Sequence, residues 1–226
     1  MMAKGDLNKE QKLVTDWILL HNDGNGNFTD TAKQTKIADF EFSWGAIFED
    51  FNLDGKQDLV VAENYVAFPP QMLFKLPCRF LLQQPDGTFA AVEQQAKVIN
   101  KKYAITPLSS DFNQDGIPDL IYVNLNGTAT AFLSDDKATN FTKNNFVKVQ
   151  LADKTKYIGA TVSVKTANGT QTNYNIIGEG LCSDQSNTLI FGLGQETEIT
   201  SITVNDSNGE IQEFKNLKLN STLKIE

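Results

Sequence analysis

The chain contains the stretch Asp50-Phe51-Asn52-Leu53-Asp54-Gly55-Lys56-Gln57-Asp58-Leu59, which recurs as Asp111-Phe112-Asn113-Gln114-Asp115-Gly116-Ile117-Pro118-Asp119-Leu120. Seven of the ten positions are identical, and the first, third, fifth and ninth positions carry side-chain oxygen atoms. Glycine at the sixth position permits the sharp turn by which these oxygens, with the carbonyl at the seventh, converge on one hard cation. The sequence therefore predicts two calcium loops. Their predicted ligands are Asp50, Asn52, Asp54, Lys56 (backbone carbonyl) and Asp58, and Asp111, Asn113, Asp115, Ile117 (backbone carbonyl) and Asp119.

Electrostatics favour a bound cation over an acidic turn without one. Each loop has three carboxylates, and a close pair repels by about 4 kcal/mol at an effective dielectric constant of about 20. Calcium suits so many protein oxygens better than magnesium does, and zinc would need cysteine or histidine ligands. A polar turn without an ion is common for a single match, but a second copy makes that alternative the weaker one.

The residues around the loops distinguish between kinds of calcium loop. An EF-hand requires a bidentate Glu at its twelfth position, where this chain has Val61 and Tyr122. Runs rich in β-branched and aromatic residues precede and follow each loop, so each loop is expected to join two strands. On these residues the chain resembles the FG-GAP/VCBS repeats of integrin-like β-propellers. The resemblance implies one calcium ion per loop, on the rim of a propeller blade.

A degenerate copy of the repeat occupies the start of the chain. Gly5-Asp6-Leu7-Asn8-Lys9-Glu10 matches the beginning of the loop but lacks the later Gly and Asp, so we expect it to bind calcium weakly or not at all. The three repeats span about 1–40, 41–100 and 101–145. Closed propellers usually have about 4 to 8 blades. We therefore expect residues 1–145 to be a partial propeller, completed by further blades or by another chain.

An apolar, proline-interrupted insertion, Tyr65–Cys78, separates two strands of the second repeat. Its prolines break regular structure. It is expected either to pack over its own blade or to serve as a partner-binding loop.

A different β pattern begins at residue 146. Phe146–Leu151, Ala160–Lys165 and Ile199–Val204 alternate with period two, and Asn168-Gly169 and Asn208-Gly209 are hairpin signals. The pattern predicts a small antiparallel β-sandwich or barrel over residues 146–226. The order of Gly-containing segments, Ile158-Gly159-Ala160, Gly178-Glu179-Gly180-Leu181-Cys182-Ser183 and Phe191-Gly192-Leu193-Gly194, resembles the ASPIC/UnbV domain. That domain follows FG-GAP/VCBS repeats in the cartilage acidic protein family. Two aromatic features of the family pattern are replaced, by Leu181 and by Asp206-Ser207.

Composition limits the partners and the chemistry. A net charge of −8 and a pI near 4.7 argue against nucleic-acid and anionic-membrane partners, and no apolar stretch is long enough to insert in a bilayer. The start Met1–Asp6 lacks the hydrophobic region of a signal peptide, which suits a mature or truncated chain. The only histidine, His21, is expected at the surface, so a Ser-His-Asp mechanism is improbable. Cys78 and Cys182 lack metal or redox spacing, and a disulfide between them is left open.

These features favour a non-enzymatic, calcium-stabilised extracellular, cell-surface or periplasmic module that binds a protein or glycan. One alternative is a polysaccharide hydrolase or lyase, which would need a carboxylate pair in a pocket. The sequence spacing singles out no such pair. A second alternative is the C-terminal scaffold of a larger propeller protein. Among the acids outside the loops, such as Glu41, Glu49, Glu63 and Glu179, no spacing marks a catalytic pair.

Overall fold

The computed structural model describes residues 16–40, 43–63, 77–125, 127–135 and 143–226. Within these residues the protein is all-β, and its one helical element is the 3-10 helix η2 (Thr155–Tyr157). No described helix is long and apolar enough to cross a membrane. The degenerate loop Gly5–Glu10, Glu41 and most of the Tyr65–Cys78 insertion lie outside the described residues.

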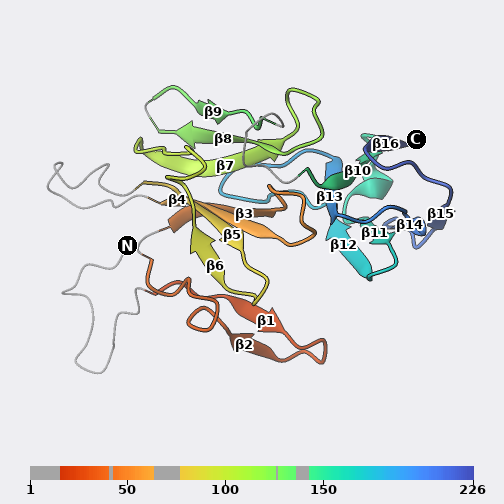
Figure 1. Ribbon diagram of the computed structural model, residues 1–226, viewed down its shortest axis with the longest axis horizontal. Coiled ribbons are helices and arrows are strands. Elements are labelled where there is room, and N and C mark those ends of the chain that lie inside the picture. The colour runs from red at the N-terminus through yellow and green to blue at the C-terminus, as the bar shows by residue number, and fades with distance from the viewer. Residues whose placement is uncertain (1–15, 41–42, 64–76, 126, 136–142) are drawn as a thin grey trace, which may run out of the picture.

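The N-terminal part consists of antiparallel strands in chain order (Figure 1). A hairpin is followed by a four-stranded sheet and then by a three-stranded sheet, and each sheet pairs only sequential neighbours. The two Asp loops connect the first and second strands of the two sheets, as the sequence predicts. The strands are β1 (Leu20–Asn22) and β2 (Phe28–Asp30); β3 (Ser43–Glu49), β4 (Asp58–Glu63), β5 (Arg79–Gln83) and β6 (Phe89–Ala91); and β7 (Ala104–Ser110), β8 (Asp119–Asn124) and β9 (Thr130–Phe132).

The two larger N-terminal sheets share one core. All six residues of β4 are buried, and Val60 and Phe80 of one sheet belong to the same apolar cluster as Leu120 and Tyr122 of the other. The first strands of the sheets approach closely, because a Cβ atom on Gly45 of β3 would lie 2.8 Å from the carbonyl oxygen of Ile105 in β7. Glycine is required there for the sheets to pack.

The C-terminal part is a sandwich of two sheets with no closed barrel among the described strands. One sheet has the order β13-β10-β16 and the other β12-β11-β14-β15. Their inward-facing residues form a single core that includes Val149, Val162, Phe191 and Ile202. The strands are β10 (Asn145–Leu151), β11 (Thr161–Lys165), β12 (Thr170–Tyr174), β13 (Thr188–Gly194), β14 (Ser201–Asn205), β15 (Ile211–Phe214) and β16 (Ser221–Ile225).

The predicted hairpins are present, but the expectation of a purely antiparallel domain is wrong for one pair. β11 pairs with β12 across Asn168-Gly169, and β14 pairs with β15 across Asn208-Gly209. β10 and β16, however, run parallel, with Val147 opposite Ser221 and Leu151 opposite Ile225. The reason is topological. β16 crosses from the other sheet after β15, so no tight turn forces it to run opposite to its neighbour.

The cysteines are not bonded to each other. Cys78 is buried and Cys182 is exposed, and both are free thiols. Burial raises the pKa of the Cys78 thiol to about 12, whereas a thiol reacts as its thiolate. We expect a maleimide to add once to the native protein, at Cys182, and a second time only after denaturation, as measured by intact mass. Two rapid additions to the native protein would contradict the burial of Cys78. No addition, even after denaturation, would indicate a disulfide.

Candidate functional site

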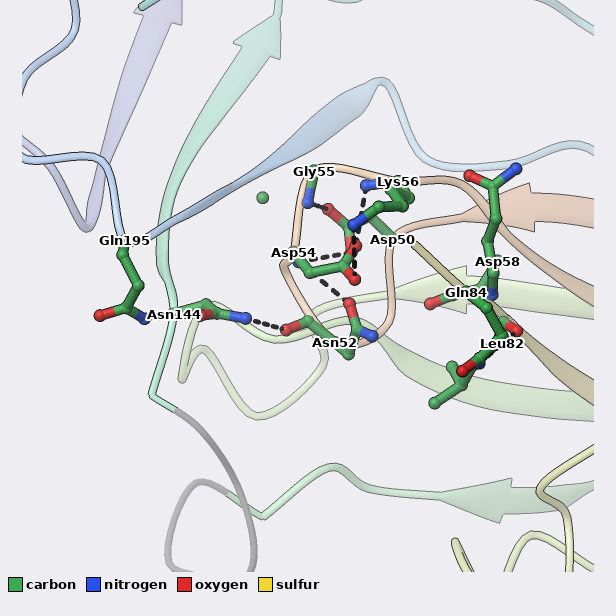
Figure 2. A network of polar contacts seen from close by, with 12 residues as sticks. Asp50, Asn52, Asp54, Gly55, Lys56, Asp58, Leu82, Gln84, Asn144 and Gln195 are labelled. Atoms are coloured by element: carbon green, nitrogen blue, oxygen red, sulfur yellow. Dashed lines mark hydrogen bonds and ion pairs between the residues drawn. The ribbon is translucent and has the colours of Figure 1, made fainter. Parts of the chain in front are cut away.

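The first Asp loop is closed by its own side chains, which accept hydrogen bonds from the loop backbone (Figure 2). Asp50 accepts from the N–H of Asp54 at 3.0 Å through Oδ1 and from the N–H of Gly55 at 2.7 Å through Oδ2. Asn52 Oδ1 also accepts from Asp54, at 3.0 Å, and Asp54 Oδ1 accepts from the N–H of Lys56 at 2.9 Å. The side chains at positions one, three and five therefore gather on one side of the turn.

The second loop repeats these contacts. Asp111 accepts from the N–H groups of Asp115 at 3.0 Å and Gly116 at 2.9 Å. Asn113 accepts from Asp115 at 3.0 Å, and Asp115 accepts from Ile117 at 2.9 Å. The duplicated sequence thus produces a duplicated geometry.

The fourth and sixth positions of both loops have left-handed backbone. Leu53 and Gln114 have φ values of 59° and 62°, and the glycines that follow two residues later have φ values of 87° and 93°. Glycine adopts this region without strain, whereas Leu and Gln rarely do. The remaining loop contacts must hold the fourth residue in place.

The ninth-position Asp ties each loop to the strands that follow it. Asp58 accepts from the N–H of Phe51 at 3.0 Å and from the N–H of Gln83, the last residue of β5, at 2.9 Å. Asp119 makes the equivalent pair of contacts at 2.8 and 2.7 Å. Each of these carboxylates is therefore part of the loop and of its own sheet.

Burial makes the charges of the first loop costly. Asp50 is 1% exposed and Asp58 is fully buried. Desolvation, with repulsion from the other loop carboxylates, raises the pKa of Asp50 to about 7 and that of Asp58 to about 8. Lys56 Nζ lies 3.1 Å from Asp54 Oδ2, but such a partly exposed pair is worth only about 0–1 kcal/mol. A cation bound among these oxygens would offset the charge.

The second loop has a positive partner from a distant strand. Lys148 of β10 places its Nζ 2.6 Å from Asp111 Oδ2, and the two side chains are 15% and 4% exposed. The first loop has no equivalent lysine at Asp50 among the described residues. The two loops are therefore alike in shape but different in charge.

Each loop offers only oxygen donors at its predicted ligand positions. In the part of the chain that the structure describes, no three His, Cys, Asp or Glu side chains form a group that could hold a metal ion as they stand. An ionised carboxylate has about four acceptor sites. The oxygens that accept from the loop backbone therefore keep capacity for a cation, and calcium accepts such oxygen-only sets.

Both loops lie against the C-terminal sandwich. The carbonyl of Leu53 accepts from the N–H of Gly194 at 2.8 Å, and the carbonyl of Asn52 accepts from Asn144 Nδ2 at 2.9 Å (Figure 2). A Cβ atom on Gly192 of β13 would lie 2.0 Å from Asp50 Oδ2. A shared apolar cluster joins the two parts, with members Leu53, Ile117, Ile190 and Phe146.

The structure therefore places the predicted ligands at the contact between the two parts of the chain. The sequence did not reveal that the loops contact Lys148, Gly192 and Asn144, because these residues lie far from the loops in the chain. A local signal was that each polar loop carries an apolar residue besides the Phe at its second position, Leu53 in the first loop and Ile117 in the second. Both are buried, at 1% and 4% exposure.

Comparison with known proteins identifies the C-terminal part. No curated protein matches the chain. A family model described as ASPIC and UnbV matches residues 150–226, which span β11 to β16 and the end of β10. Residues 150–226 are therefore an ASPIC/UnbV domain.

Proposed function

We propose that this protein is a non-enzymatic, calcium-stabilised interaction module, in which the two Asp loops hold calcium where they contact the ASPIC/UnbV domain. The observation that carries the proposal is the duplicated loop geometry, in which the same side-chain oxygens close both turns with nearly the same distances. A polar turn without a function would not need to keep four oxygen-bearing positions in two copies.

Calcium is proposed to bind through three carboxylates, one amide oxygen and one backbone carbonyl in each loop. When bound, it neutralises the carboxylates and so favours the loop conformation to which the ASPIC/UnbV domain docks. The first loop, where burial raises the pKa of Asp50 and Asp58, gains most from the ion. In the second loop Lys148 competes with calcium for Asp111, so that site is proposed to be the weaker one.

The N-terminal sheets are proposed to be two consecutive FG-GAP/VCBS blades of a β-propeller. Support comes from the sequential strand order of both sheets and from the close approach of their first strands, β3 and β7. The hairpin β1–β2 belongs to a preceding, shortened blade. Further blades or another chain would complete the ring.

The proposed setting is the extracellular space, the cell surface or the periplasm. Calcium loops whose ligands are all oxygen atoms suit surroundings rich in that ion. The proposed partner is a protein or a glycan, and the net charge of −8 disfavours nucleic acid.

Calcium is expected to raise the melting temperature of the full chain relative to chelator. At free calcium of about 100 times the dissociation constant, one site adds about 2.7 kcal/mol, which is about 5–10 °C for a domain of this size. Asp54→Asn should remove most of this increment, because it takes a carboxylate from the first loop. The measurement is differential scanning calorimetry in millimolar calcium and in EDTA.

Two controls accompany the calcium experiment. Asp86→Asn changes an acidic turn whose carboxylate caps Thr88 outside the Asp loops, so the calcium increment should be retained. Magnesium should give a smaller increment than calcium, because it demands a tighter octahedral shell. Equal melting temperatures of the unmodified protein in calcium and EDTA would overturn the proposal.

A further inference from the structure

The hairpin β1–β2 repeats the hairpin β5–β6 of the four-stranded sheet in the same register. Leu20 and Phe28 correspond to Leu81 and Phe89, which lie 61 residues later, and the two Asp loops are separated by the same offset. In each hairpin the Phe begins the second strand and lies opposite the residue two positions after the Leu. Equivalent positions in the two hairpins can therefore be compared directly.

The equivalent residues differ in exposure. Leu81 and Phe89 are 1% and 6% exposed, whereas Leu20 and Phe28 are 59% and 60% exposed. Leu81 and Phe89 are buried because they share an apolar cluster with Ile37, which follows the β1–β2 hairpin. Side chains alternate along a strand, so Leu20 and Phe28 lie on the face of the hairpin that points away from this contact. We call Leu20 and Phe28 the hairpin face.

A second exposed apolar face lies on β8 and β9, at the opposite end of the N-terminal part (Figure 1). Phe112 is 49% exposed, whereas Phe51, at the same position of the first Asp loop, is 7% exposed. Ile121 of β8 is half-buried, whereas its counterpart Val60 in β4 is fully buried. Leu133, directly after β9, is 63% exposed. We call Phe112, Ile121 and Leu133 the β8–β9 face.

The described sheets already make the contact for which these two faces are equipped. The hairpin unit covers the front of the four-stranded sheet, where Leu81 lies. The back of that sheet, with Val60, is covered in turn by the front of the three-stranded sheet, with Leu120. The hairpin face is the front of the first unit, and the β8–β9 face is the back of the last. They are therefore the two halves of a contact that the described residues make twice.

We propose that a second copy of this chain covers both faces, with the β8–β9 face of each copy packed against the hairpin face of the other. The described residues of one copy supply three units, namely the hairpin, the four-stranded sheet and the three-stranded sheet. Closed propellers have about 4 to 8 blades, so two copies supply enough units for a ring and a third copy would exceed the range. Contacts between unlike faces form a ring when their rotation closes.

This proposal rests on the proposed propeller blades and names the chain that completes them. A second copy suits the hairpin face better than an unrelated apolar partner does. It presents Phe112 and Ile121 at the positions where Phe51 and Val60 cover the next sheet within the chain. Exposed apolar patches of this kind mark protein contacts.

Sedimentation equilibrium of the full chain tests the ring, and we expect a dimer at micromolar concentration. Leu20→Glu and Leu133→Glu each place a charge on one face, and each should weaken dimerisation by about 100-fold or more, because burying an unpaired charge is costly. Ile211→Glu changes a residue of β15 that is 68% exposed and lies in the ASPIC/UnbV domain, so this variant should remain a dimer. All three variants should keep the circular dichroism spectrum of the folded protein.

An equimolar mixture of the two interface variants tests whether unlike faces bind. Leu133→Glu keeps an intact hairpin face and Leu20→Glu keeps an intact β8–β9 face. The mixture should therefore contain more dimer than either variant alone, through one intact contact. If hairpin faces bound each other instead, Leu133→Glu alone would remain a dimer, and the proposal would be overturned.

Other outcomes separate the ring from the calcium sites. An unmodified protein that stays monomeric would overturn the ring, as would a polymer that grows with concentration, because its contacts do not close at two copies. A monomer whose melting temperature rises with calcium overturns the ring alone. A dimer whose melting temperature ignores calcium supports the ring and overturns the calcium part of the proposed function.

Discussion

Lys148→Met is expected to lower the free energy of unfolding by about 3 kcal/mol in EDTA. The substitution removes the ammonium that lies 2.6 Å from Asp111 and leaves a carboxylate of 4% exposure without its partner. Breaking a buried pair on one side costs about 3–5 kcal/mol. Methionine keeps most of the apolar stem, so the loss reports the charge. Urea denaturation in EDTA measures it.

The same variant should respond more strongly to calcium than the unmodified protein. Without Lys148, the second loop has an uncompensated Asp111, and calcium no longer competes with an internal ammonium. We expect calcium to restore most of the lost stability and titration calorimetry to show tighter binding at one site. A variant that calcium does not rescue would contradict the proposed competition.

Lys215→Met is the matched control for Lys148→Met. Lys215 Nζ lies 3.1 Å from Glu213, but the two side chains are 61% and 49% exposed. Exposed pairs contribute little, so this variant should leave the stability and its calcium dependence nearly unchanged. A loss as large as that of Lys148→Met would show that charge burial is not the cause.

Gly192→Ala is the second substitution with a large expected effect. Its Cβ would lie 2.0 Å from Asp50 Oδ2 and 2.4 Å from the Cα of Leu53. The backbone atoms of Leu53 have no flexible side chain to move, so β13 and the first loop must separate. Overpacking of this kind costs about 1–3 kcal/mol, and displacement of the loop should also weaken calcium binding. Thermal unfolding with and without calcium measures both.

Gly127→Ala is the control for this steric effect. Its Cβ would meet its nearest neighbours at 3.7 and 3.9 Å, which is ordinary contact. Neither glycine has the left-handed φ that disfavours alanine, so the two substitutions differ mainly in the space available. Gly127→Ala should be neutral or slightly stabilising. If Gly192→Ala were equally harmless, the close approach of loop and β13 would be refuted.

Local features of the fold were predictable from the sequence. Glycine at the sixth loop position and Asn-Gly at two hairpins specify turns through backbone that other residues rarely adopt. Strand alternation in Phe146–Leu151 specifies a half-buried strand, observed as β10. These predictions succeed because each depends on residues close together in the chain.

Long-range contacts were not predictable in this way. Lys148 follows Asp111 by 37 residues, and nothing in either sequence neighbourhood indicates the pairing. Glu49 and Glu179 had no distinguishing spacing, yet both line one cleft. The parallel pairing of β10 with β16 likewise depends on the path of the chain between two sheets. Alternation reports which face of a strand is buried, but it does not report the strand's neighbour.

The parallel pairing of β16 with β10 has a consequence for synthesis on the ribosome. The sheet that faces the Asp loops stays incomplete until residues 221–225 have been translated. Phe146 of β10 and Ile190 of β13, which cover Leu53 and Ile117, belong to that unfinished sheet, and exposed apolar groups on a nascent chain favour aggregation. A chaperone or an early-bound ion at the loops would protect the emerging polypeptide during this interval.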